Sequence, residues 1–99
     1  MKIAELVPGM DGVTVRARVL SLSGVRERAT RRGVRRIVEG EIEDDTGRIR
    51  LVVWDERVHD LASVSVSDTI HIVNGFVSSF KGVKELNVGR LGRIRKRVG

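Results

Sequence analysis

Two kinds of side chain in this sequence could carry chemistry: a small group of carboxylates and three aromatic rings. Asp44, Asp45, Asp55 and Glu56 are the only plausible seed of an active site, such as a two-metal nuclease centre. However, Asp45 suits a turn, Asp44 and Asp55 suit strand ends, and no His or Lys is spaced to complete an acid–base pair. The sequence therefore predicts no enzyme and no catalytic residue.

Metal and thiol chemistry lack the necessary side chains. The chain contains no Cys, and its two His residues, His59 and His71, are isolated from each other. Disulfides, thiol catalysis and zinc sites with thiolate ligands are thus excluded, and two separate His are too few for a histidine metal cluster. We expect neither a metal nor a cofactor.

The aromatic rings indicate a binding function instead of catalysis. Trp54, Phe76 and Phe80 are the only three aromatic residues, and the two Phe lie four apart in NGFVSSFKG, among Ser, Gly and Lys. In a strand, residues 76, 78 and 80 share one face, opposite Val77. Trp54 falls on the same side as Arg50, away from the apolar face of its own strand. We expect all three rings to lie outside the core, where a single binding surface explains the set better than three separate packing contacts with a loop or tail.

Charge indicates what such a surface binds. The chain has 19 Lys and Arg against 13 Asp and Glu, a formal net charge of +6 and a pI of about 11.0. Six Arg fall between Gly24 and Arg36, and RIRKR forms a second cluster near the end. A charge run alone is often only a solvated surface, but combined with exposed rings it favours single-stranded nucleic acid, because unpaired bases can stack on rings while cations meet phosphates. The bases of a duplex are already stacked and present only their edges.

The spacing of apolar residues predicts short strands. Val13, Val15, Ala17 and Val19 alternate with polar residues, and the parity then slips at Leu20 and Leu22, which indicates a β-bulge. After an Arg-rich loop, a second strand ends at the turn DDTG, and a third strand, RIRLVVW, directs Ile49, Leu51 and Val53 inward.

The second half of the chain continues this pattern. DERVHDLAS allows one or two turns of helix, and the strand after it requires a second slip of parity at Asn74-Gly75, because Ile70 and Ile72 face inward on one parity and Val77 on the other. Lys81-Gly82 makes a short turn before a last strand with Leu86 and Val88 on one side.

Five short strands with one minor helix predict an all-β fold, for which the five-stranded Greek-key OB-fold barrel fits best and an SH3-like barrel is the main competitor. We expect one domain over residues 1–92 and a basic C-terminal tail over residues 93–99. No apolar run is long enough to span a membrane, and the start of the chain lacks a secretory signal. The expected location is cytoplasmic.

Three segments together carry a family resemblance. LVPGM at residues 6–10, DDTGRIRLVVWDE at residues 44–56 and NGFVSSFKGVKELNVGRLG at residues 74–92 resemble the single-OB single-stranded DNA-binding proteins of archaea. They also resemble the OB domains of replication protein A and of the human sensor-of-single-strand complexes. The resemblance covers nearly the whole chain and rests on the order and spacing of the motifs as a group.

The resemblance implies non-catalytic, largely sequence-independent binding of single-stranded DNA, which would protect it in replication, recombination or repair beside other proteins of these processes, in a nucleoid-associated location. It assigns base stacking to Trp54 and the two Phe, and places Asn87 where some members carry a fourth aromatic. The predicted contacts are Trp54, Phe76, Phe80, Arg28, Arg35, Arg50, Lys81, Lys84 and Arg90. An RNA-binding or tRNA-binding OB domain and a protein-interaction module remain the alternatives.

Overall fold

The computed structural model describes residues 1–97 and contains seven strands and two short 3-10 helices in that range. In chain order they are η1 (Ile3–Glu5), β1 (Val13–Leu22), β2 (Arg26–Thr30), β3 (Gly33–Asp44), β4 (Gly47–Trp54), η2 (Asp55–Leu61), β5 (Thr69–Phe80), β6 (Val83–Val88) and β7 (Arg93–Lys96). The predicted all-β class, with one short helix before the fourth barrel strand, is confirmed.

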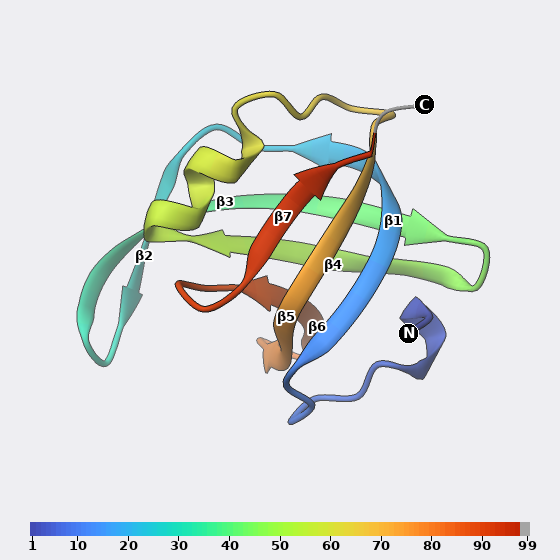
Figure 1. Cartoon of the computed structure of the whole chain (residues 1–99). Helices are drawn as coiled ribbons and strands as arrows, with labels where there is room; N and C mark the ends of the chain where they lie inside the picture. Colours follow the sequence, from blue (N-terminus) through green and yellow to red (C-terminus); the bar gives the residue numbers. More distant parts are fainter. Residues whose placement is uncertain (98–99) are drawn as a thin grey trace.

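Five of the strands close into a barrel (Figure 1). The order is β1-β3-β4-β6-β5, and β5 pairs back onto β1, so that the sheet has no open edge around the ring. Neighbouring pairs are antiparallel except for β4 and β6, which run parallel. This closed Greek-key arrangement is the expected OB-fold.

The interior of the barrel is filled by aliphatic side chains that alternate along each strand. Its buried cluster includes Val15 and Val19 of β1, Leu51 of β4, Ile72 of β5 and Leu86 of β6. None of the three aromatic residues belongs to this cluster. The inward faces predicted for these strands are therefore confirmed, and the aromatic rings lie outside the core.

Both predicted slips of parity occur as bulges. The register between β1 and β3 shifts between Val19 and Ser21. Val13 of β1 pairs with Gly75 of β5, and Val15 pairs with Ile72, so β5 contains one extra residue at this point. Asn74, which lies between Ile72 and Gly75, has a φ of 59°. Asn is among the residues that tolerate this left-handed conformation best. The second bulge turns Phe76 outward while Val77 faces the core.

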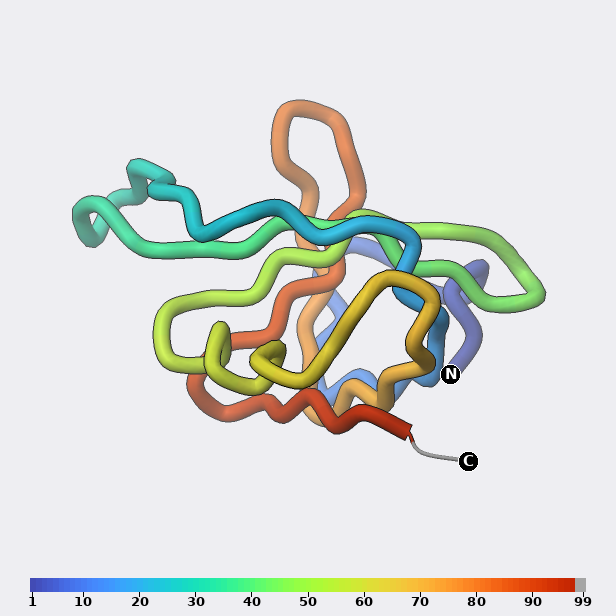
Figure 2. Tube along the Cα trace, turned by 90° about the horizontal axis from the view of Figure 1, so that it is seen from above, coloured from blue at the N-terminus to red at the C-terminus, as the bar shows by residue number. Residues whose placement is uncertain are grey.

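The Arg-rich segment, predicted above to be a loop, is a hairpin. β2 pairs with β3 from Arg26 opposite Ile37 to Thr30 opposite Gly33. This hairpin and the β5–β6 hairpin both project from the barrel, in teal and in orange in Figure 2. The prediction was wrong because apolar alternation is weak in a segment so rich in Arg.

The sheet also continues beyond Gly92, the expected end of the barrel. Strand β7 pairs with β5, with Ile94 opposite Ile72, and Ile94 is buried in the core. The backbone N–H of Ile94 donates to Asp60 Oδ2 of η2 at 2.9 Å. Residues 93–96 are thus an added edge strand where a tail was expected, whereas residues 98–99 of that tail lie outside the described residues. Within residues 1–97, no helix is long and apolar enough to cross a membrane.

Candidate nucleic-acid interface

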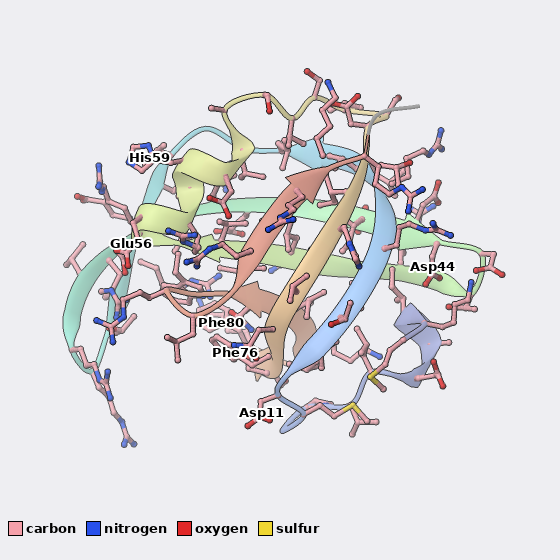
Figure 3. All side chains as sticks on the ribbon, in the orientation of Figure 1. Asp11, Asp44, Glu56, His59, Phe76 and Phe80 are labelled. Carbon is pink, nitrogen blue, oxygen red and sulfur yellow. The ribbon has the colours of Figure 1, made fainter. Side chains whose placement is uncertain are left out.

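The three aromatic rings lie on one outer face of the barrel. Trp54 is the last residue of β4, while Phe76 and Phe80 both come from β5 and are labelled in Figure 3. Phe76 is 40% exposed, whereas Trp54 and Phe80 are half-buried. Three residues of β5 between the rings give the two Phe the same side of the strand.

These rings line a set of adjoining hollows, which we call the aromatic groove. One hollow of about 280 Å³ is lined by all three rings, and a second of about 400 Å³ is lined by Trp54 and Phe76. A third, of about 960 Å³, extends from Phe76 between the loop before β1 and the loop after β6. Phe76 lines all three hollows, so an extended ligand could pass along it without leaving the surface.

Arg28 of β2 reaches into the groove and is held there. Its guanidinium nitrogens donate to the two carboxylate oxygens of Glu85 at 3.2 and 3.3 Å, and Glu39 lies 3.8 Å away. The same guanidinium lies 4.1 Å from the centroid of the Phe80 ring, a cation–π distance. The side chain is only 12% exposed. Arg28 therefore connects the β2–β3 hairpin to the aromatic face.

Arg35 makes a second ion pair beside Trp54. Its Nε donates to Asp55 Oδ2 at 2.6 Å, and its guanidinium carbon lies 5.7 Å from the Trp54 ring centroid. The hydrogen bond from Arg35 holds the pKa of Asp55 below its ordinary value of 3.8. Because the folded pKa is lowered, this pair stabilises the protein above about pH 4 and ceases to do so as the pH falls through the folded value.

The other predicted cations fall into two groups: those held by an oxygen partner within the protein, and those without an ion pair, which we call open cations. Arg50 Nη1 lies 3.7 Å from Glu85, and Lys84 Nζ donates to the carbonyl oxygen of Leu6 at 2.8 Å. Lys81 at the tip of the β5–β6 hairpin lies 5.4 Å from the Phe80 centroid, and Arg90 lines the largest hollow. Within residues 1–97, neither of these two makes an ion pair.

Two further open cations come from the β2–β3 hairpin. Arg31 and Arg32 line the second hollow, both are exposed, and neither has an ion-pair partner among the described residues. The hairpin therefore supplies cations to the rim of the groove, whereas Arg28 and Arg35 from the same hairpin are neutralised by carboxylates.

A buried polar layer, which the sequence did not predict, lies beneath the rings. Glu85 and Asn87 of β6 point outward, as their alternation with Leu86 predicts, but each is only 1% exposed. Ile37 and Val52 on the same outer face are also buried without joining the core cluster. Arg28 of the β2–β3 hairpin pairs with Glu85, and the indole of Trp54 donates to Asn87. No local signal in β6 reveals these long-range contacts.

Neutralising Asp55 is expected to strengthen the electrostatic part of nucleic-acid binding. In Asp55→Asn, Arg35 loses its carboxylate and becomes available to a phosphate, so the slope of log affinity against log salt should steepen by about 0.7 for a single strand. Asn also tolerates the φ of 46° at this position. Affinity for an oligothymidine, measured over a series of NaCl concentrations, tests this.

The matched control is Asp68→Asn, which makes the same change of charge outside the hollows, at an ion pair with Lys96. Its slope should stay close to that of the unmodified protein. Equal slopes for Asp55→Asn and Asp68→Asn would show that Arg35 gains no phosphate when its partner is removed.

Metal-binding geometry is absent from the described part of the chain. In residues 1–97, no three His, Asp or Glu side chains are placed to hold an ion together. Among the carboxylates considered above, Asp44 accepts hydrogen bonds from the backbone N–H groups of Ile3 and Thr46, both at 2.8 Å. Asp45 forms an ion pair with Lys2. These interactions anchor the N-terminal segment to the β3–β4 turn.

Comparisons with known proteins agree with this geometry. The chain is 36% identical over 93 residues to the single-stranded DNA binding protein Ssb of Saccharolobus solfataricus, which covers 94% of this chain and 61% of that protein. It is 33% identical over 97 residues to replication factor A of Methanothermobacter thermautotrophicus, covering 95% of this chain and 12% of that protein. The chain therefore spans less than two thirds of either relative.

A solved structure supports the same relationship. The replication factor A related protein from Methanobacterium thermoautotrophicum superimposes with a TM-score of 0.82 at 28% identity, over 98% of this chain and 89% of that one. The resemblance inferred from the sequence is thereby confirmed. A family described as an OB-fold nucleic acid binding domain matches residues 13–94, and the chain belongs to that family.

Proposed function

We propose that this chain binds single-stranded DNA without sequence specificity, through base stacking on Trp54, Phe76 and Phe80, and that it catalyses no reaction. The observation that carries the proposal is the placement of all three aromatic residues of the chain along one groove on the outside of a basic barrel. Stacking on rings is tolerant of base identity because every base has a π-face. The relatives described above are named for single-stranded DNA binding and for replication.

The distribution of charge supports a defined orientation of the strand. The floor of the groove is close to neutral, because Glu85 is paired with Arg28 and Arg50, and Asp55 with Arg35. The open cations Arg31, Arg32 and Arg90 line its hollows, where Asp11 and Glu56 are the exposed carboxylates, and Lys81 lies near Phe80. In our proposal the bases enter the neutral floor and stack, while the phosphates remain at the cationic rim.

The wider role is proposed on the same basis. Binding that ignores sequence and excludes the duplex protects exposed strands during replication, recombination or repair, and it places the protein beside other proteins that act on the same strands. RNA is the alternative ligand, because the same rings and cations suit either polymer and the choice depends on contacts to the 2′-hydroxyl.

The single Trp offers a direct test. Adding an oligothymidine of about 12 to 20 nucleotides should quench the intrinsic fluorescence. Trp54 is the single Trp of the chain and the source of this fluorescence, and a thymine is expected to stack on it. The titration should be repeated with an RNA of the same length and sequence type as competitor. Binding that is demonstrable by another method but leaves the fluorescence unchanged would remove Trp54 from the site.

A further inference from the structure

Asn87 lies at the centre of the outer face, beneath the aromatic groove. It is the fifth residue of β6 and pairs with Phe76 of β5 on one side and with Val52 of β4 on the other. Its side chain points away from the barrel interior, yet the residue is only 1% exposed. A polar side chain with this little exposure must find its hydrogen-bond partners within the protein.

Its hydrogen bonds connect β4 to β5. Asn87 Nδ2 donates to the Ser78 hydroxyl at 2.8 Å and to the carbonyl oxygens of Phe76 and Glu85 at 3.2 and 3.3 Å. Asn87 Oδ1 accepts from Trp54 Nε1 at 2.9 Å. The indole nitrogen is a donor only, so Oδ1 must be the atom that faces Trp54, and the three acceptors on the other side require Nδ2 there. The amide is thus locked in one orientation.

We propose that Asn87 is a positioning residue, which holds the indole of Trp54 in the orientation that stacks on a base. This inference rests on the proposed function. Trp54 is half-buried at the end of β4, and its polar edge is fixed by the amide, while the guanidinium groups of Arg28 and Arg35 lie 5.7 Å from the ring centroid. A ring that is already ordered in the free protein loses little rotamer freedom when the strand binds.

The same hydrogen bonds separate this role from that of a fourth stacking residue. Asn87 is only 1% exposed, so it cannot itself offer a face to a base, and both its amide nitrogen and its amide oxygen are hydrogen-bonded within the protein. Where an aromatic residue at this position would enlarge the stacking surface, Asn87 instead orders the surface that Trp54 provides. The position therefore contributes to binding through another residue.

The test is a double-mutant cycle between Asn87 and Trp54. Asn87→Leu keeps the number of side-chain heavy atoms but removes the acceptor of the indole together with the amide donor. It should weaken oligothymidine binding about 3- to 10-fold, as expected for freeing one side chain, at an unchanged salt slope. Trp54→Phe keeps a ring but has no N–H, so adding Asn87→Leu in that background should change affinity less than about twofold. A labelled oligonucleotide measures affinity in all four proteins.

A spectroscopic signature accompanies the cycle. The single indole N–H resonance should move and exchange faster with solvent in Asn87→Leu, because the indole then has no acceptor within the protein. If Asn87→Leu does not fold, Asn87→Ser serves with the same readouts, since Ser is too short to replace the amide at Nε1.

The outcomes distinguish this inference from the proposed function. If Asn87→Leu weakens binding as much in the Trp54→Phe protein as in the unmodified protein, the inference is overturned, because Asn87 would then act on the fold and not through the indole. An unchanged affinity in Asn87→Leu, despite faster indole exchange, would overturn it as well. If Trp54→Ala itself binds oligothymidine normally, the stacking role given to Trp54 in the proposed function fails instead.

Discussion

Replacing Arg28 by Ala is expected to lower the free energy of unfolding by about 3 kcal/mol, because it leaves the buried carboxylate of Glu85 without its bidentate partner. Arg50 Nη1 remains 3.7 Å from Glu85 and compensates in part, so we expect the lower end of the range for broken buried ion pairs. Chemical denaturation measures the change. Arg26→Ala, on the same hairpin but with an exposed side chain, is the matched control and should alter stability by less than about 0.5 kcal/mol.

A second variant separates the effect of the unpaired charge on stability from a general loss of packing in Arg28→Ala. If the penalty comes from an uncompensated charge, adding Glu85→Gln to Arg28→Ala should recover a large part of the lost stability, since a neutral amide is far less costly to bury than a carboxylate. A stability for Arg28→Ala within error of that for Arg26→Ala would mean that the β2–β3 hairpin does not rest on the aromatic face in solution.

Replacing Trp54 and Phe76 together by Ala should weaken the binding of oligothymidine by about 2 to 6 kcal/mol, because each ring is expected to supply about 1 to 3 kcal/mol of stacking. The slope of log affinity against log salt should remain nearly unchanged, since stacking releases no counterions. Replacing Arg31 and Arg32 by Ala should do the opposite and lower the slope by about 1.4, at about 0.7 for each phosphate that is no longer neutralised.

Two controls test whether the ring variants affect stacking and not the stability of the fold or the surface in general. Phe76→Ala alone should destabilise the fold by well under the ~3 to 5 kcal/mol of a buried Phe, because its ring is 40% exposed. Val66→Ala removes an exposed apolar side chain that lines none of the three hollows and should leave binding unchanged. A ring variant whose salt slope falls as much as that of the Arg variant would mean that the rings do not act by stacking.

Much of the barrel follows from local pattern in the sequence. Alternation along β1 and β4 places Val15 and Leu51 inside, and breaks in the alternation of β1 and β5 mark the two bulges, because a slip of one residue exchanges the two faces of a strand. The outward direction of Phe76 depends on the second break, at Asn74-Gly75. Since both faces of β5 carry apolar residues, the composition of the strand alone would not have placed the ring.

Other features depend on interactions between distant residues and could not be predicted in the same way. Glu85 looks like an ordinary solvent-facing residue of β6, yet it is buried and pairs with Arg28, 57 positions earlier in the chain, and with Arg50. Similarly, Ile94 is a lone apolar residue in a basic segment, and its place in the core follows from pairing with Ile72. Cation runs such as the β2–β3 hairpin show where positive charge is concentrated, but not which Arg is neutralised by a carboxylate.

The central claim is that unpaired bases stack in the aromatic groove, and a competition titration tests it most directly. A labelled oligothymidine bound to the protein should be displaced by unlabelled single-stranded DNA at least roughly tenfold more effectively than by duplex DNA of equal length, at about 0.15 M salt, because duplex bases are not available to the rings. Equal displacement by the duplex would contradict the account, since it would show a surface that binds any polyanion through its charge alone.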